Sequence, residues 1–118
     1  MPLGTAPIGP LSHSSALREV VWLLLSVHAD IRAGQMFGCP AFFLGRRMVA
    51  CVYGDEVGIK LPSARVEELL VQPDIEPFRP YGKDKMREWV ALRHRNEARN
   101  AVAGLLHEAV AYARAQSK

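Results

Sequence analysis

The sequence predicts a single α+β domain in which helices pack on an antiparallel sheet, with elements in the order α-β-β-β-α-β-β-α. Three short apolar runs between Met36 and Pro62 are separated by glycine turns, which is typical of a β-meander. Apolar residues recur at three- and four-residue steps near both ends of the chain, which indicates flanking helices. A length of 118 residues and a hydrophobic content of 49% are enough for one core.

Residues 1–14 are predicted to be a tail or a docked arm, and residues 15–118 the domain. The tail is rich in proline and glycine and cannot sustain a helix or a core strand. A first helix is expected from Ser15 to Ala33, ending at Gly34. Its apolar face is expected to comprise Leu17, Val20, Val21, Leu24, Val27 and Ile31. Trp22 falls off that face, so we expect the helix to touch a second surface.

Three strands are expected over residues 37–44, 47–53 and 57–61. Gly45–Arg46 and Gly54–Asp55 are two-residue turns between them, because glycine readily adopts the backbone angles that tight hairpins need. Pro40 indicates a strand start or an edge strand. The middle strand is apolar on both faces and is expected to be central. In the third strand, apolar residues alternate with Gly58 and Lys60, which predicts one face open to solvent.

The second half of the chain predicts a short helix over 64–71 and an edge strand over 75–79 that contains Pro77. Residues 86–92 show neither clean period, and we favour a strand over a helix there. A last helix is expected from about Asn96. Its apolar stripe is Ala98, Val102, Leu105, Leu106, Ala109, Val110 and Ala113.

Composition favours a cytoplasmic protein. Both cysteines, Cys39 and Cys51, lie in apolar runs, where an unpaired cysteine behaves as a small buried hydrophobe. The longest apolar run, Val20 to Val27, is too short to cross a bilayer, so no membrane association is expected. It also lacks the positive segment that precedes a signal peptide core, since Arg18 is followed by Glu19.

The basic residues are concentrated in one region. Residues 79–99 hold seven basic and three acidic side chains, a net charge of +4 within a chain of +3. Such a region can attract nucleic acid or an acidic partner, although interspersed acidic residues also suit an ordinary solvated surface. The candidate contacts, including two in the first hairpin, are Arg46, Arg47, Arg79, Lys83, Lys85, Arg87, Arg93 and Arg95.

No pattern in the chain predicts a reaction centre, a metal site or a cofactor site. The histidines and cysteines are too far apart for a local chelating pair, and glycine-rich nucleotide-binding motifs are absent. Cys39 is the one candidate for a reactive thiol, but no basic residue lies near it in sequence to lower its pKa. The aromatic residues Phe42, Phe43 and Tyr53 are interpreted as core residues rather than as a base-stacking surface.

A set of motifs in fixed order resembles the TfoX N-terminal domain family. The residues that carry the resemblance are Met36, Phe37, Gly38, Gly54, Asp55, Lys60, Leu61, Pro62, Phe78, Met86 and Trp89. The resemblance covers roughly residues 15 to 113. It implies a small α+β fold of the secretion-chaperone-like or YjbR-like kind and a regulatory role, since the family's namesake controls competence genes in bacteria. This chain departs from the family at Cys39–Pro40, where further small residues are usual, and it has no room for the namesake's second domain.

These observations lead to two hypotheses of function. The first is a non-enzymatic bacterial module that regulates by binding another protein, including a second copy of itself as a homodimer. It is motivated by the two apolar faces of the middle strand and by Trp22. The alternative is a nucleic-acid-binding protein that uses the basic 79–99 region.

Overall fold

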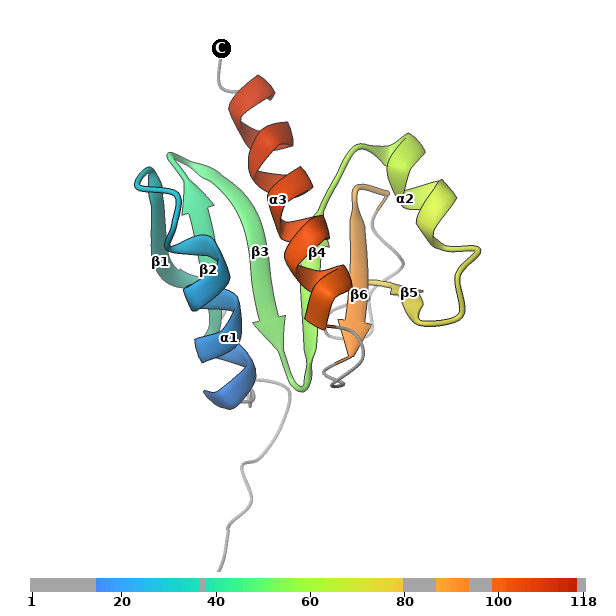
Figure 1. The fold of residues 1–118 in the computed structure, drawn as a ribbon, viewed down its shortest axis with the longest axis horizontal. Helices are drawn as coiled ribbons and strands as arrows, with labels where there is room; N and C mark the ends of the chain where they lie inside the picture. The colour runs from blue at the N-terminus through green and yellow to red at the C-terminus, as the bar shows by residue number, and fades with distance from the viewer. Residues whose placement is uncertain (1–14, 37, 80–86, 94–98, 117–118) are drawn as a thin grey trace, which may run out of the picture.

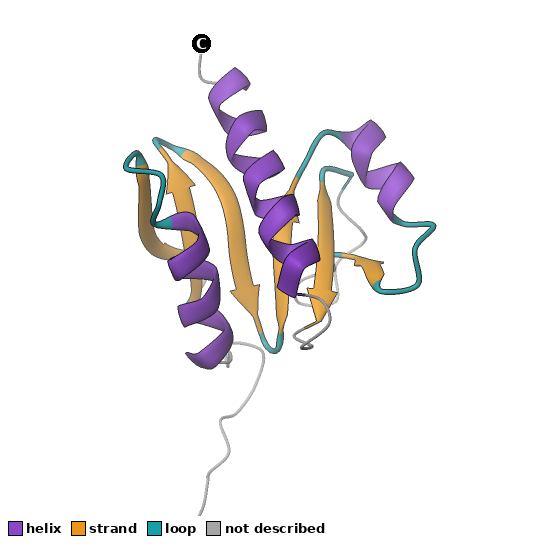
Figure 2. Ribbon diagram, in the orientation of Figure 1, coloured by secondary structure: helices purple, strands orange, loops and turns teal. Residues whose placement is uncertain are grey.

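The structure is a computed structural model that describes residues 15–36, 38–79, 87–93 and 99–116. It confirms the α+β class, with three helices packed on one six-stranded antiparallel sheet (Figures 1 and 2). The predicted tail, residues 1–14, lies outside the described residues. The helices are α1 (Ser15–Leu25), α2 (Ser63–Leu69) and α3 (Arg99–Gln116). The strands are β1 (Ile31–Met36), β2 (Cys39–Leu44), β3 (Arg47–Tyr53), β4 (Glu56–Lys60), β5 (Ile75–Pro77) and β6 (Trp89–Arg93).

The first helix is shorter than the sequence predicts, and a strand replaces its last part. We expected a helix to Ala33, but α1 ends at Leu25 and the chain then turns into β1. The Ser26 hydroxyl donates to the Leu23 carbonyl at 3.2 Å, a local bond that competes with further helix formation. Ile31, expected on the helix stripe, is instead buried opposite Leu44 of β2. Pairing with β2 therefore overrides the helical period.

The sheet order is β1-β2-β3-β4-β6-β5, so β3 is central, as predicted. Gly45 and Gly54 have φ values of 63° and 62°, which confirms both predicted turns. A third tight turn, with Gly38 at φ 82°, joins β1 to β2. Pro40 lies near the start of β2, where β3 has no paired residue, and Pro77 lies in the edge strand β5. At both positions the strand is paired on one side only, so the missing N–H of proline removes no hydrogen bond to a second strand.

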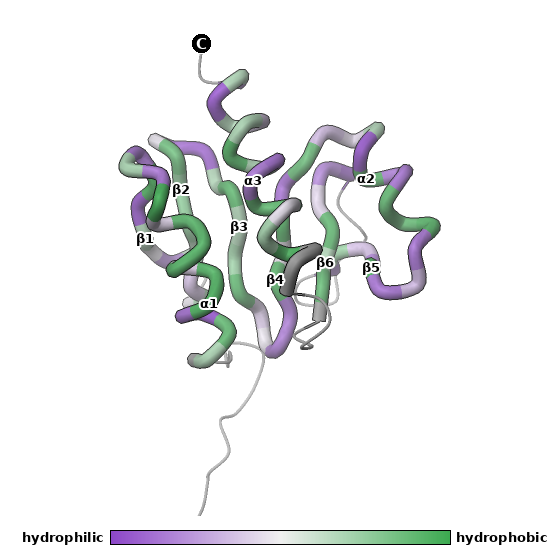
Figure 3. The backbone as a smooth tube through the Cα atoms, viewed as in Figure 1, coloured by the Kyte–Doolittle hydropathy of each residue, from purple (hydrophilic) through white to green (hydrophobic). Residues whose placement is uncertain are grey.

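The main core lies between the helices and one face of the sheet. Leu17, Val21 and Leu25 of α1 are buried there, as are Val66 and Leu69 of α2. The predicted stripe of α3 is buried from Val102 to Ala113, and Ala98 lies outside the described residues. Trp22 stacks on Phe42 with ring centroids 6.0 Å apart, which explains its place off the helix stripe. Figure 3 shows that β2 and β3, beneath the helices, are largely hydrophobic along their length.

The opposite face of the sheet carries a second cluster, which we name the rear cluster. Its buried members are Ala41, Phe43, Cys51, Phe78, Trp89 and Ala91. The prediction that the third strand, now β4, has one face open to solvent is wrong, because Gly58 of this strand is buried beneath Phe78. A Cβ atom at Gly58 would lie 2.9 Å from Phe78 Cζ, so a glycine is needed for this ring to reach the sheet.

Candidate protein-interaction site

The edge strand β1 presents an open backbone edge among the described residues. It pairs with β2 on one side, and the sheet order places it at the end of the sheet (Figure 1). Arg32, Ala33, Gln35 and Met36 are all exposed. A strand at the end of a sheet presents a row of N–H and C=O groups that can pair with another chain.

The turn at Gly38 decides which backbone groups of β1 are free. Met36 lies directly opposite Cys39 across a two-residue turn, so these two residues exchange hydrogen bonds with each other. Because hydrogen bonding alternates along an antiparallel pair, Arg32 and Gly34 also bond to β2. The N–H and C=O groups of Ala33 and Gln35 therefore point away from β2, outward from the edge of the sheet.

The one charged side chain of β1 does not protect this edge. Arg32 turns back over β2, where its guanidinium lies 4.6 Å from the centroid of the Phe43 ring. It also donates to the Gly45 carbonyl at 3.1 Å. Natural proteins commonly block exposed edges with charges, prolines or very short strands. β1 has six residues, no proline and one charged side chain, which lies over β2 instead of along the edge.

The other sheet edge is blocked in the usual way. β5 has only three residues, and one of them is Pro77, which has no N–H to donate. A pocket of about 380 Å³ lies beside this edge, between α2 and β6. Apolar side chains of Val66, Leu70, Pro77 and Trp89 contribute to its wall, and Ser63, Glu67 and Arg87 add polar groups. Such a pocket suits one apolar side chain of a partner.

The candidate basic residues that the structure describes lie at two ends of the sheet. Arg46, in the β2–β3 turn, and Arg87 are exposed at one end. Arg47, beside Arg46, donates to the Gln116 carbonyl of α3 at 2.9 Å. Arg93 lies opposite Glu56 in the register, at the other end of β6. That end is about 13 Å from Trp89 at the usual rise per residue.

Arg79 is exposed at the end of the sheet away from Arg87. It lines a recess of about 370 Å³ with Asp55, Glu56 and Glu76, which makes its surroundings acidic. Lys83, Lys85 and Arg95 lie outside the described residues. The candidate cations that the structure describes are thus divided between two ends of the sheet, and three acidic residues offset the positive charge of Arg79.

Of the aromatic residues considered for base stacking, Phe42 and Phe43 are core residues, as predicted, and Tyr53 is half-buried against the rear cluster. Phe42 and Phe43 project from opposite faces of β2 and are 1% and 8% exposed. Tyr53 contacts Phe78 edge-on at 6.2 Å, and Phe78 lies 5.6 Å from Trp89. The rings of Tyr53, Phe78 and Trp89 thus pack in series on the rear face, as in a core cluster.

Neither cysteine forms a disulfide, and both are buried in neighbouring strands. Burial, and after it the nearby Cys39, raises the pKa of the Cys51 thiol to about 12. Cys51 is therefore a neutral thiol at neutral pH. Cys39, the candidate nucleophile, is 4% exposed. Among the described residues, no group of three His, Cys, Asp or Glu side chains could hold a metal ion.

The motif residues behind the TfoX resemblance occupy structural positions where they are described. Gly38 and Gly54 form turns, whereas Leu61, Phe78 and Trp89 are buried. Lys60 forms an ion pair with Glu88 at 3.9 Å. Met36 and Asp55 are exposed, Pro62 immediately precedes α2, and Phe37 and Met86 lie outside the described residues.

Comparison with protein-family models, curated proteins and solved structures gave no match. The resemblance to the TfoX N-terminal domain family therefore stays a prediction from the order of its motifs. No helix in the described part of the chain is long and apolar enough to cross a membrane.

The β1 edge is a candidate site that sequence reasoning missed. The apolar steps from Leu17 to Ile31 continue the helical period, so residues 31–33 were assigned to the helix. A signal was present in the spacing, since Phe37–Gly38 separates two six-residue segments that can pair as a hairpin.

Proposed function

We propose that the chain is a non-enzymatic protein-interaction module in which β1 accepts an extended segment of another protein as an additional strand. The observation that carries the proposal is the open edge of β1, whose Ala33 and Gln35 backbone groups point outward. In this mode of binding, main-chain hydrogen bonds supply affinity, and neighbouring side chains supply selectivity. The exposed Gln35 and Met36 would contact alternate side chains of the added strand.

The regulatory role belongs to the same proposal. The TfoX resemblance implies a module that acts on gene expression in the bacterial cytoplasm through a partner, and strand addition is one physical route to such a partner. Disordered segments suit this route because they carry unpaired backbone groups.

The proposal is tested with a library of short extended peptides selected on the full-length chain. Selected peptides are titrated by fluorescence anisotropy against wild type, Ala33→Pro and Ala33→Thr. Ala33→Pro removes an outward N–H without removing a bond to β2, so the sheet can still form. Ala33→Thr keeps that N–H and suits a strand.

We expect affinity to fall about tenfold in Ala33→Pro, the equivalent of one lost hydrogen bond, and to persist in Ala33→Thr. Urea unfolding of both variants establishes that they are folded. Peptides that bind wild type and folded Ala33→Pro equally would contradict binding at β1. Failure to select any peptide would count against the proposal as well.

A further inference from the structure

We infer that the partner strand at β1 is β1 of a second copy of this chain, paired antiparallel so that Gly34 faces Gly34 across a two-fold axis. Two six-stranded sheets would then form one continuous sheet. This inference rests on the proposed function and names the partner of the same edge. It is derived from three features of β1: which residues have outward N–H and C=O groups, the Ile31 N–H that already donates within the chain, and the pattern of the side chains.

The alternation of outward backbone groups along β1 permits this strand to pair with β1 of a second copy. A two-fold axis perpendicular to the sheet makes the strands antiparallel and keeps the helix face of both copies on one side. The side chains of residues directly opposite each other in the two strands must then point to the same face of the sheet. The axis therefore lies level with one residue, which faces its own counterpart, and not midway between two residues. The two β1 strands overlap over a long stretch when the axis lies level with Ala33 or with Gly34.

The Ile31 N–H distinguishes the two registers. It already donates to the His28 carbonyl at 3.1 Å. A centre at Ala33 would place Ile31 opposite Gln35 and would require that same N–H for the Gln35 carbonyl. A centre at Gly34 instead places Ala33 opposite Gln35, where both residues have their outward N–H and C=O free of β2. Four hydrogen bonds form there without any contribution from Ile31.

The side chains of this register are compatible. Arg32 faces Met36 of the second copy, so the single charge of β1 never meets its own counterpart. Gly34 faces Gly34 in a close, non-hydrogen-bonded pair, where the absence of side chains lets the backbones approach. Because Arg32 is held over Phe43 and Gly45, its guanidinium does not obstruct the edge.

The expected dimer is weak. Five residues of each strand overlap, and such an interface belongs to the transient class that buries less than about 1,200 Å². Sedimentation velocity is therefore run on the full chain from micromolar to near-millimolar protein. We expect the weight-average sedimentation coefficient to rise with concentration in wild type and in Ala33→Thr, and to stay at the monomer value in Ala33→Pro.

Disulfide trapping reads the register directly. Arg32→Cys and Met36→Cys variants, one carrying a tag, are mixed under mild oxidation with a redox buffer. The proposed register places these two positions directly opposite each other, where cross-strand Cβ atoms are about 5 Å apart. We expect a tagged–untagged heterodimer from the mixture and at least tenfold less cross-linking from either variant alone.

The outcomes separate this inference from the proposed function. A wild type that stays monomeric at all concentrations, or a mixture that cross-links no better than either variant alone, overturns the Gly34-centred dimer. If library peptides still bind in an Ala33-dependent manner, the proposed strand addition stands and only the identity of the partner is wrong. If the peptides do not bind and the mixed variants cross-link, β1 is a self-association site alone.

Discussion

Gly58 shows how a single residue organises the rear of the sheet. Its missing side chain leaves space that Phe78 fills, and Phe78 in turn lies between Tyr53 and Trp89. The Cys51 sulfur would lie 3.1 Å from a Cβ at Gly58. The rear cluster therefore closes over a glycine that the alternating pattern alone assigns to a solvent-facing position.

Gly58→Ala should destabilise the fold by about 1–3 kcal/mol, because the packed Phe78 ring has to move to admit a methyl group. The matched control is Gly104→Ala in α3, where a new Cβ meets nothing within 4 Å. That substitution should stabilise by about 0.5–1 kcal/mol, since alanine favours a helix over glycine.

Both free energies of unfolding come from urea titrations. In a Phe78→Leu background, Gly58→Ala should cost less than it does in wild type, because the two positions share one space. Equal costs in both backgrounds would mean that Phe78 is not what limits residue 58.

At the scale of elements, competition between a helix and a hairpin decides the N-terminal part of the fold. The run from Leu17 onward supports helical periodicity, but β1 gains a ladder of six paired positions with β2. Val27, which the helical pattern assigns to the core, is 78% exposed. Hairpin pairing with the next strand thus outweighs helical periodicity in this segment.

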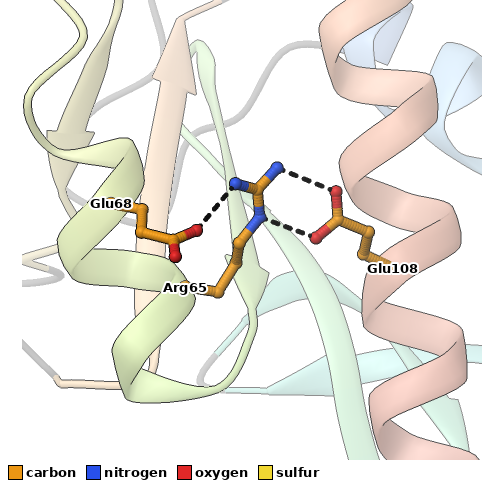
Figure 4. A network of polar contacts seen from close by, with 3 residues as sticks. All are labelled: Arg65, Glu68 and Glu108. Atoms are coloured by element: carbon orange, nitrogen blue, oxygen red, sulfur yellow. Dashed lines mark hydrogen bonds and ion pairs between the residues drawn. The ribbon is translucent and has the colours of Figure 1, made fainter.

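Helices α2 and α3 are connected by an ion-pair network (Figure 4). Arg65 of α2 binds both carboxylate oxygens of Glu108 at 2.9 and 3.1 Å, and it also donates to Glu68 at 3.1 Å. Hydrogen bonding to Glu108, and then to Glu68, raises the pKa of Arg65 above its ordinary value. The Arg65 side chain is 37% exposed, so solvent screens the pair.

A double-mutant cycle with Arg65→Ala and Glu108→Ala should give a coupling free energy of about 0.5–1 kcal/mol. The coupling should shrink as sodium chloride is raised, because salt screens exposed charges. Arg65→Lys should retain only part of it, since lysine cannot form the paired bonds. The Arg65–Glu68 cycle within α2 serves as the control and should give about 0.3–0.5 kcal/mol. A coupling of zero between Arg65 and Glu108 in urea titrations would contradict the geometry.

For the whole molecule, the arrangement of charge bears on the nucleic-acid alternative. Arg46 and Arg87 lie at one end of the sheet, and Arg79 lies at the other beside Asp55 and Glu56. The Arg47 guanidinium donates a hydrogen bond to the Gln116 carbonyl at the end of α3. Of the candidate cations that the structure describes, Arg46 and Arg87 are the two exposed at one end, so a phosphate backbone that follows this end would meet one or two of them at a time.

If the described candidate cations alone contact the phosphates, binding to a labelled duplex should depend only weakly on salt, with a slope of log affinity against log salt shallower than about −2. Fluorescence anisotropy between low and moderate sodium chloride measures that slope. Arg46→Ser and Arg87→Ser should each reduce it by up to about one unit, while Arg18→Ser in α1 should leave it unchanged. A slope of about −5 or steeper would show a phosphate-binding surface larger than the described cations form.

Much of the fold follows from local pattern. Gly45 and Gly54 predict the two turns of the β2–β4 meander, and proline predicts the β5 edge. The stripe of α3 predicts the helix that covers the sheet. These predictions hold because turn angles, missing N–H groups and a sustained helical period are properties of a few neighbouring residues.

The candidate site could not be predicted in the same way. Residues 31–36 become a strand, and β1 becomes an open edge, only because β2 lies on one side of them and no described strand lies on the other. Likewise, Gly58 is buried because Phe78, twenty residues later, returns to the same face of the sheet. Local sequence specifies which conformations each segment can adopt, whereas the contacts between segments select among them and determine which backbone groups face away from the rest of the sheet.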